Sequence, residues 1–128
     1  MIILLSSDCR SERLDIALLF DDSESIFSEG KREQVVVWMK KLLNMYGIDG
    51  VQRRAALMQW SDRIGEVIDF DERLDEQELS QRIDNIIDPL RGGTHGDEAL
   101  DAAFQRFFHG SGDPEVWQTR HEQYFKTI

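Results

Sequence analysis

A run of five oxygen-bearing side chains, Asp21-Asp22-Ser23-Glu24-Ser25, directly follows the nearly continuous apolar segment 14–20. Alternation along the chain can turn one carboxylate and two hydroxyls, those of Asp21, Ser23 and Ser25, toward a common point. Such hard oxygen donors suit Mg²⁺, Mn²⁺ or Ca²⁺ better than zinc or copper. The pentapeptide therefore indicates a cation site. A second interpretation stays open: one of the serines only begins the following helix, whose positive N-terminal end attracts the acids.

The elements that must position these residues follow from the spacing of apolar side chains. A continuous apolar run such as 14–20 is typical of a strand covered on both faces. Apolar residues at three- and four-residue spacing predict an amphipathic helix over 28–46, which ends at Gly47. Residues 54–61 and 66–70 are predicted as strands, and Asp62-Arg63 as the tight turn between them.

The helical pattern returns after Asp75 and is closed by Pro89. A glycine-marked loop over 91–96 then leads into a fourth helical pattern that continues to Phe107. Strand, helix, hairpin, helix, loop and helix is the order of an α/β layered domain with right-handed crossovers. In open sheets of this class, ligands bind beyond the carboxyl ends of the strands, where the pentapeptide falls.

Composition limits the class of protein. The 128 residues fit one domain, and 41% hydrophobic residues predict a globular core. The formal charge of −10 argues against nucleic acid and anionic membrane surfaces. No stretch reaches the apolar length of a membrane span, and the opening apolar run lacks the basic segment of a secretory signal. Cys9 is the lone cysteine, either a free thiol or half of a disulfide to another segment.

Three motifs in order resemble the von Willebrand factor type A (VWA) domain and its metal-ion-dependent adhesion site (MIDAS). Residues 15–26, Asp-Ile-Ala-Leu-Leu-Phe-Asp-Asp-Ser-Glu-Ser-Ile, are similar to the family's first strand and its Asp-x-Ser-x-Ser motif. Residues 54–62 resemble the second strand. Residues 92–100, Gly-Gly-Thr-His-Gly-Asp-Glu-Ala-Leu, resemble the family's Gly-Gly-Thr loop. The resemblance covers roughly residues 15–107.

The resemblance implies a Rossmann-like fold with a central parallel strand, an antiparallel hairpin at the edge and flanking helices. It implies a Mg²⁺-type ion held directly by Ser23, Ser25 and Thr94, with Asp21 reached through water. An open coordination position would accept the carboxylate of a protein partner, because neutral hydroxyl ligands leave the cation's charge largely uncompensated. The metal would serve recognition and not catalysis. For Thr94, capping of the next helix is the alternative, and His95 is expected to be a solvated loop residue.

Two departures from the family pattern set further expectations. The family's fourth strand ends in a Thr-Asp-Gly type turn, which the sequence does not show; Asp113 is a poor substitute because no apolar strand precedes it. We therefore expect a C-terminally truncated domain over 14–108, between a lead at 1–13 and a tail at 109–128. Its first strand would have an exposed edge, self-association would follow, and metal affinity would be weak. The second departure is Glu24, which either strengthens ion binding or repels an acidic ligand.

The resulting functional prediction is a metal-dependent binding module from an extracellular matrix or cell-adhesion protein, with a matrix protein such as collagen as one candidate partner. Cys9 precedes the first strand, where such modules often carry a disulfide half. Two alternatives remain: an intracellular VWA scaffold or an inert remnant of one, in the cytoplasm, and a Mg²⁺-dependent phosphotransfer or receiver-like domain. The last class needs a phosphate-accepting aspartate and a cationic partner from later strands.

Overall fold

Two parallel strands, β2 (Leu14–Asp21) and β3 (Arg53–Trp60), form the middle of the sheet. The computed structural model describes residues 2–7, 13–86, 89–93, 95–108 and 125–127. Within these residues the strand order is β4-β3-β2-β1-β5, with β4 (Ile64–Ile68) antiparallel to β3. The α/β fold with a parallel centre and an antiparallel hairpin at one edge is thus confirmed.

The strand β1 (Ile2–Ser7) corrects the prediction that the first apolar strand lies at an exposed edge. It pairs antiparallel with β2 from Ile2↔Leu19 to Ser7↔Leu14, and β5 (Phe125–Thr127) pairs with β1 in turn. The most apolar strand is therefore flanked on both sides. Its backbone groups on the side away from β3 bond to β1, so the edge that was expected to drive association is covered.

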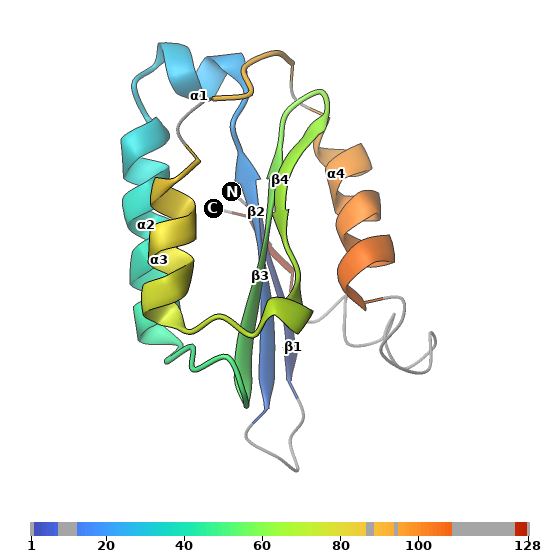
Figure 1. Cartoon of the computed structure of the whole chain (residues 1–128). Coiled ribbons are helices and arrows are strands. Elements are labelled where there is room, and N and C mark those ends of the chain that lie inside the picture. The colour runs from blue at the N-terminus through green and yellow to red at the C-terminus, as the bar shows by residue number, and fades with distance from the viewer. Residues whose placement is uncertain (1, 8–12, 87–88, 94, 109–124, 128) are drawn as a thin grey trace.

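Helices cover both faces of the sheet (Figure 1). On one face α2 (Arg32–Met45) and α3 (Glu76–Asp84) bury Met39, Leu43 and Leu79 against alternate residues of β2. On the other face α4 (Gly96–Ala103) and the π-helical turn η2 (Phe104–Phe108) pack on the remaining residues of β2 and β3. Because both faces are covered, β2 is apolar and buried from Ile16 to Phe20, as its sequence predicted.

The predicted element boundaries differ from the structure at two places. The helix expected over 28–46 begins only at Arg32, as α2, and a separate short helix, α1 (Glu24–Ser28), precedes it, with Gly30 at φ +68° between them. The strand expected over 66–70 begins earlier, as β4, and ends at Ile68. Asp69 instead begins the 3₁₀ turn η1 (Phe70–Glu72), whose capping box it forms with Glu72. The turn at Asp62-Arg63 is confirmed by the Ser61 N–H, which bonds the Arg63 carbonyl at 2.9 Å.

Among the described residues, no helix is both long and apolar enough to cross a membrane. Cys9, Thr94, Asp113 and most of the 109–128 tail lie outside the described residues, so the predictions made for them are not tested by the structure.

Candidate metal site

The pentapeptide lies where β2 ends and α1 begins, at the carboxyl end of the central parallel strands. Ser23 takes the N-cap position of α1 but its side chain makes no capping hydrogen bond. Its hydroxyl lies instead 3.2 Å from the Ser25 hydroxyl. The Ser23 hydroxyl therefore does not cap α1, and the cation site stays a prediction.

The spacing of the two hydroxyls fits a divalent cation. Oxygens that occupy neighbouring positions on octahedral Mg²⁺ at about 2.0–2.1 Å lie about 2.9 Å apart, close to the distance between Ser23 Oγ and Ser25 Oγ. The carboxylate of Asp21 is turned back over the same loop, since its Oδ1 accepts the Ser23 N–H at 3.0 Å. The donor set of Asp21, Ser23 and Ser25 is thus gathered at one turn of chain.

The donor set relies on hydroxyls. Among the described residues no three His, Cys, Asp or Glu side chains are grouped so that they could hold a metal ion. A site made of serine hydroxyls and one carboxylate carries little negative charge. Hard cations bind such sites more weakly than carboxylate-rich ones.

The Gly92-Gly93 loop lies beside the pentapeptide loop, as the resemblance implies. The Glu24 N–H donates to the Gly92 carbonyl at 2.9 Å, and Gly92 has φ +80°, a conformation that favours glycine. Thr94 itself lies outside the described residues, so its role as a ligand stays a prediction. His95, and not Thr94, takes the N-cap position of α4, and its side chain makes no capping bond. His95 is exposed, as expected of a solvated loop residue.

Glu24 does not act as a free carboxylate. Its side chain forms a bidentate ion pair with Arg91, which precedes Gly92, and the guanidinium lowers the pKa of Glu24 chiefly through its hydrogen bond. The Arg91 guanidinium also stacks over the Phe27 ring at 4.6 Å. Neither Arg91 nor Phe27 was singled out from the sequence, because their pairing depends on a contact between distant loops.

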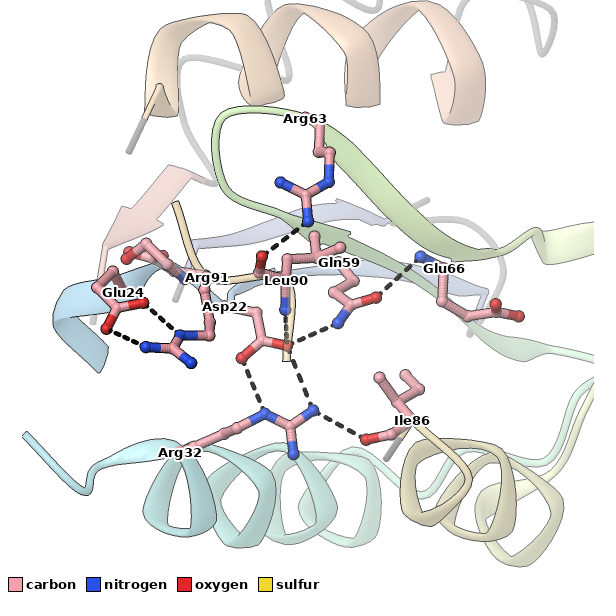
Figure 2. A network of polar contacts seen from close by, with 11 residues as sticks. Asp22, Glu24, Arg32, Gln59, Arg63, Glu66, Ile86, Leu90 and Arg91 are labelled. Carbon is pink, nitrogen blue, oxygen red and sulfur yellow. Dashed lines mark hydrogen bonds and ion pairs between the residues drawn. The ribbon is translucent and has the colours of Figure 1, made fainter. Parts of the chain in front are cut away.

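Asp22 was predicted only as one acid of the pentapeptide, and it turns out to be fully buried. Its carboxylate accepts hydrogen bonds from Arg32 Nε at 2.8 Å, Gln59 Nε2 at 2.6 Å and the Leu90 N–H at 3.2 Å (Figure 2). Asp22 therefore faces away from the hydroxyls of the candidate metal site and into the protein.

A cavity of about 230 Å³ adjoins the second loop. Its walls come from the β3–β4 turn and the first turns of α4, and include Trp60, Asp62, His95 and Ala102. The indole N–H of Trp60 is buried without a hydrogen-bond partner among the described residues. A group bound in this cavity would lie next to His95, the residue that follows Thr94.

Comparison with known proteins places these features in context. The sequence profile of the von Willebrand factor type A domain matches residues 15–120. Human collagen alpha-5(VI) chain is 30% identical over 110 residues, which cover 86% of this chain and 4% of the collagen chain. This chain therefore spans only a small part of that relative.

Solved structures with a similar fold come from the mussel byssus. One crystal form of proximal thread matrix protein 1 matches with a TM-score of 0.66 and 24% identity, over 79% of this chain and 27% of that protein. The structure of the same protein with a zinc-occupied MIDAS motif matches with a TM-score of 0.65 and 22% identity, over 77% of this chain and 27% of that one. At this identity the likeness shows the fold alone.

Proposed function

This chain belongs to the von Willebrand factor type A domain family, and on that premise we propose that it is a metal-dependent protein-binding module of an extracellular matrix or cell-adhesion protein. The observation that carries the proposal is the 3.2 Å approach of the Ser23 and Ser25 hydroxyls at the end of β2, beside the Gly92-Gly93 loop. A matrix setting is supported by the relative that shares 30% sequence identity, a human collagen chain.

Ser23, Ser25 and Thr94 would hold Mg²⁺ or Mn²⁺, and Asp21 would act through a bound water. The bound ion supplies positive charge that mostly neutral ligands leave uncompensated. The protein's own residues orient the site: Asp21 accepts the Ser23 N–H and fixes the turn, and Glu24 is already paired with Arg91. An acidic side chain of a partner would therefore meet a net positive centre, and we assign the site to recognition and not to catalysis.

Two alternatives are less well supported. A receiver-like or phosphotransfer domain would use the acid pair Asp21-Asp22 at the strand end, whereas the Asp22 carboxylate is buried and held by Arg32, Gln59 and Leu90. An intracellular scaffold with the same domain would share the metal site, so the geometry does not favour it over the extracellular module.

Titration calorimetry of the full chain with Mn²⁺ tests the proposal. We expect weak but saturable binding, with Ser25→Ala reducing the affinity at least about tenfold because one direct ligand is lost. Ser28→Ala is the matched control, since Ser28 is exposed on the same short helix and donates only to the Ser25 carbonyl. Absence of Mn²⁺ binding by the unaltered chain, or equal effects of both substitutions, would contradict the metal site.

Partner binding is tested separately by passing the chain over immobilised collagen in Mg²⁺ and then in EDTA. Binding that EDTA abolishes would support a collagen partner. Metal binding without collagen binding would remove collagen as the partner and leave the metal-dependent module in place.

A further inference from the structure

Asp22 is the centre of a buried polar network that joins four segments of the chain (Figure 2). Its Oδ1 accepts Arg32 Nε from α2, and its Oδ2 accepts Arg32 Nη2 at 3.3 Å and Gln59 Nε2 from β3. The Leu90 N–H, from the segment that leads into Gly92-Gly93, completes the set at Oδ2. The carboxylate is thus satisfied by four donors although water does not reach it.

The network joins the segment 90–93, the second loop of the candidate metal site, to the pentapeptide 21–25, the first loop. Besides the Leu90 N–H contact, the backbone carbonyl of Asp22 accepts the Arg91 N–H at 2.8 Å. Two consecutive amides of the segment before Gly92 therefore bond to the one residue that lies between the Asp21 and Ser23 donors. Arg63 Nη2 holds the Leu90 carbonyl at 2.8 Å from the other side.

Arg32 also joins Asp22 to the segment that directly follows α3. Its Nη2 donates to the Ile86 carbonyl at 2.8 Å while its guanidinium lies over the Phe20 ring at 5.5 Å. Residue 86 begins the connection that runs from α3 to Leu90. Both ends of this connection are therefore tied to the Asp22–Arg32 pair.

A buried ion pair of this kind fixes the relative position of the segments that it joins more than it adds to the free energy of folding. Burying two charges costs nearly as much as their attraction returns, whereas removing one partner is strongly unfavourable. What the pair does fix is geometry, since an arginine fork and a carboxylate accept few relative orientations. Rigidity of the ligand set is one of the factors that set the affinity for a hard cation.

We infer that Asp22, with Arg32 and Gln59, is a positioning residue that sets the Gly92-Gly93 loop against the loop that carries Ser23 and Ser25. This inference rests on the proposed function for its metal readout. It assigns a role to the second residue of Asp-x-Ser-x-Ser, which the family motif leaves unspecified. Asp22 does not touch the ion in this assignment; it acts through the loop.

The chain contains a matched control for the test. Asp15 and Arg54 form a second bidentate Arg–Asp pair between β2 and β3, with distances of 2.9 and 2.7 Å, at the opposite end of the same strands. Asp15→Asn weakens strand pairing without touching either loop. Asp22→Asn weakens the strand pairing and also the contact between the two loops, because an amide nitrogen then faces the donors of Arg32 or Gln59.

Two measurements on the full chain decide the inference. The first is Mn²⁺ affinity by calorimetry at a temperature where every variant is folded. The second is amide hydrogen exchange by NMR, in which the rate at Leu90 is divided by the rate at Leu57 in the buried β3 strand. A loss of global stability alone raises the Leu57 rate by at least as large a factor as the Leu90 rate, so a rise in the ratio reports local opening at Leu90.

We expect Asp22→Asn to weaken Mn²⁺ binding at least about fivefold and to raise the Leu90 to Leu57 ratio at least about tenfold. Asp15→Asn should leave both within about twofold of the unaltered chain. If Asp22→Asn does not fold, Arg32→Lys and Arg54→Lys form a milder pair, since lysine keeps the charge and loses the fork.

Equal effects of the two pairs on both readouts would overturn the inference and leave Asp22 with a structural role only. If the unaltered chain does not bind Mn²⁺, the proposed function fails. The Leu90 to Leu57 ratio then decides alone whether Asp22 anchors the loop, because that ratio is measured without metal.

Discussion

The side chains of Glu24 and Arg91 form an ion pair that spans the two loops of the candidate metal site, with Arg91 Nη2 2.8 Å from Glu24 Oε1. Glu24 occupies the second variable position of Asp-x-Ser-x-Ser, and Arg91 directly precedes Gly92-Gly93. The carboxylate that sets this chain apart from the usual family pattern is thus balanced by a cation from the facing loop. The field at the site then depends on both residues together.

Removal of the cation should therefore tighten metal binding. In Arg91→Ala the Glu24 carboxylate has no partner, and additional negative charge near a hard cation raises its affinity. Because both groups are about half exposed, we expect a gain in Mn²⁺ affinity of only about threefold at low salt. Calorimetry of Arg91→Ala and of the Glu24→Gln/Arg91→Ala double variant measures it. The double variant should lose the gain; a loss of affinity in both variants would indicate that Arg91 mainly supports the loop.

Gly92 and Gly30 offer a matched pair for testing the second loop. Both have positive φ, +80° and +68°, so alanine costs about 1 kcal/mol of backbone strain at either position. A Cβ at Gly92 would also lie 2.7 Å from Asp62 Oδ2, whereas one at Gly30 meets nothing within 4 Å. The Asp62 carboxylate is the end of an exposed side chain and can move away, so we expect similar losses in the free energy of unfolding. The Kd for Mn²⁺ should rise only in Gly92→Ala, because only Gly92 lies in the loop beside the metal site. Calorimetry and urea titration of both variants check this. Equal Kd values would show that the Gly92-Gly93 loop does not contribute to metal binding.

The pairing of β1 with β2 predicts the association state. Ile3 is only 2% exposed and packs in the core with Ile16 and Leu18. Ile3→Asp should cost about 3 kcal/mol or more and release β1, which exposes the edge of β2 and causes self-association. Sedimentation velocity should show a monomer for the unaltered chain and for the control Met45→Asp, where the methionine is exposed. Association of the unaltered chain would restore the expectation of an uncovered edge.

Asp49 predicts part of the acid sensitivity. Its carboxylate accepts the N–H groups of Val51, Arg53 and Gln52, and these bonds lower its pKa from the ordinary 3.8. A group whose pKa is lower in the folded state adds stability above pH 3.8, and that stability is lost as the pH falls through the folded pKa. Carbon-detected NMR titration should place the Asp49 midpoint below 3.8. In Asp49→Asn the loss of stability between pH 5 and 3 should be smaller, and an unchanged slope would contradict the assignment.

The main elements could be predicted from the sequence because their signals are local. The apolar run is buried from Ile16 to Phe20, and the spacing in α2 and α3 correctly predicted the burial of Met39, Leu42, Leu79 and Ile83. Trp38 and Met45 share the predicted apolar spacing but are exposed. The strand β4 was misplaced because Gly65 and the acids near it dilute the alternation, while Asp69 diverts the chain into a capped turn. The strand β1 was missed because its apolar run was considered only as a secretory signal, and its pairing with β2 was not predicted.

The contacts of the candidate site could likewise be predicted only where they join residues close in sequence. The hydroxyls of Ser23 and Ser25 are two residues apart, so their 3.2 Å separation follows from local geometry, whereas their role as metal ligands stays a prediction. Asp22 and Arg32 are ten residues apart, and Asp22 and Leu90 are 68 apart. No periodicity links such positions, since the contacts exist only after the sheet has brought β2, α2 and the loop before Gly92 together. The contribution of Thr94 stays a prediction.

The arrangement of β1 beside β2 also bears on the order in which the domain folds. The β1–β2 pair joins neighbouring segments in antiparallel register, whereas the β2–β3 pair closes only after the chain has crossed over through α1 and α2. Strands close in sequence cost less loop-closure entropy when they pair than distant strands do. The β1–β2 hairpin can therefore form first, and β3 can then pair with β2. Substitutions in the hairpin should then slow folding, while substitutions in α4 should mainly speed unfolding. The N-terminal strand would thus be a nucleus for the sheet as well as a cover for its central strand.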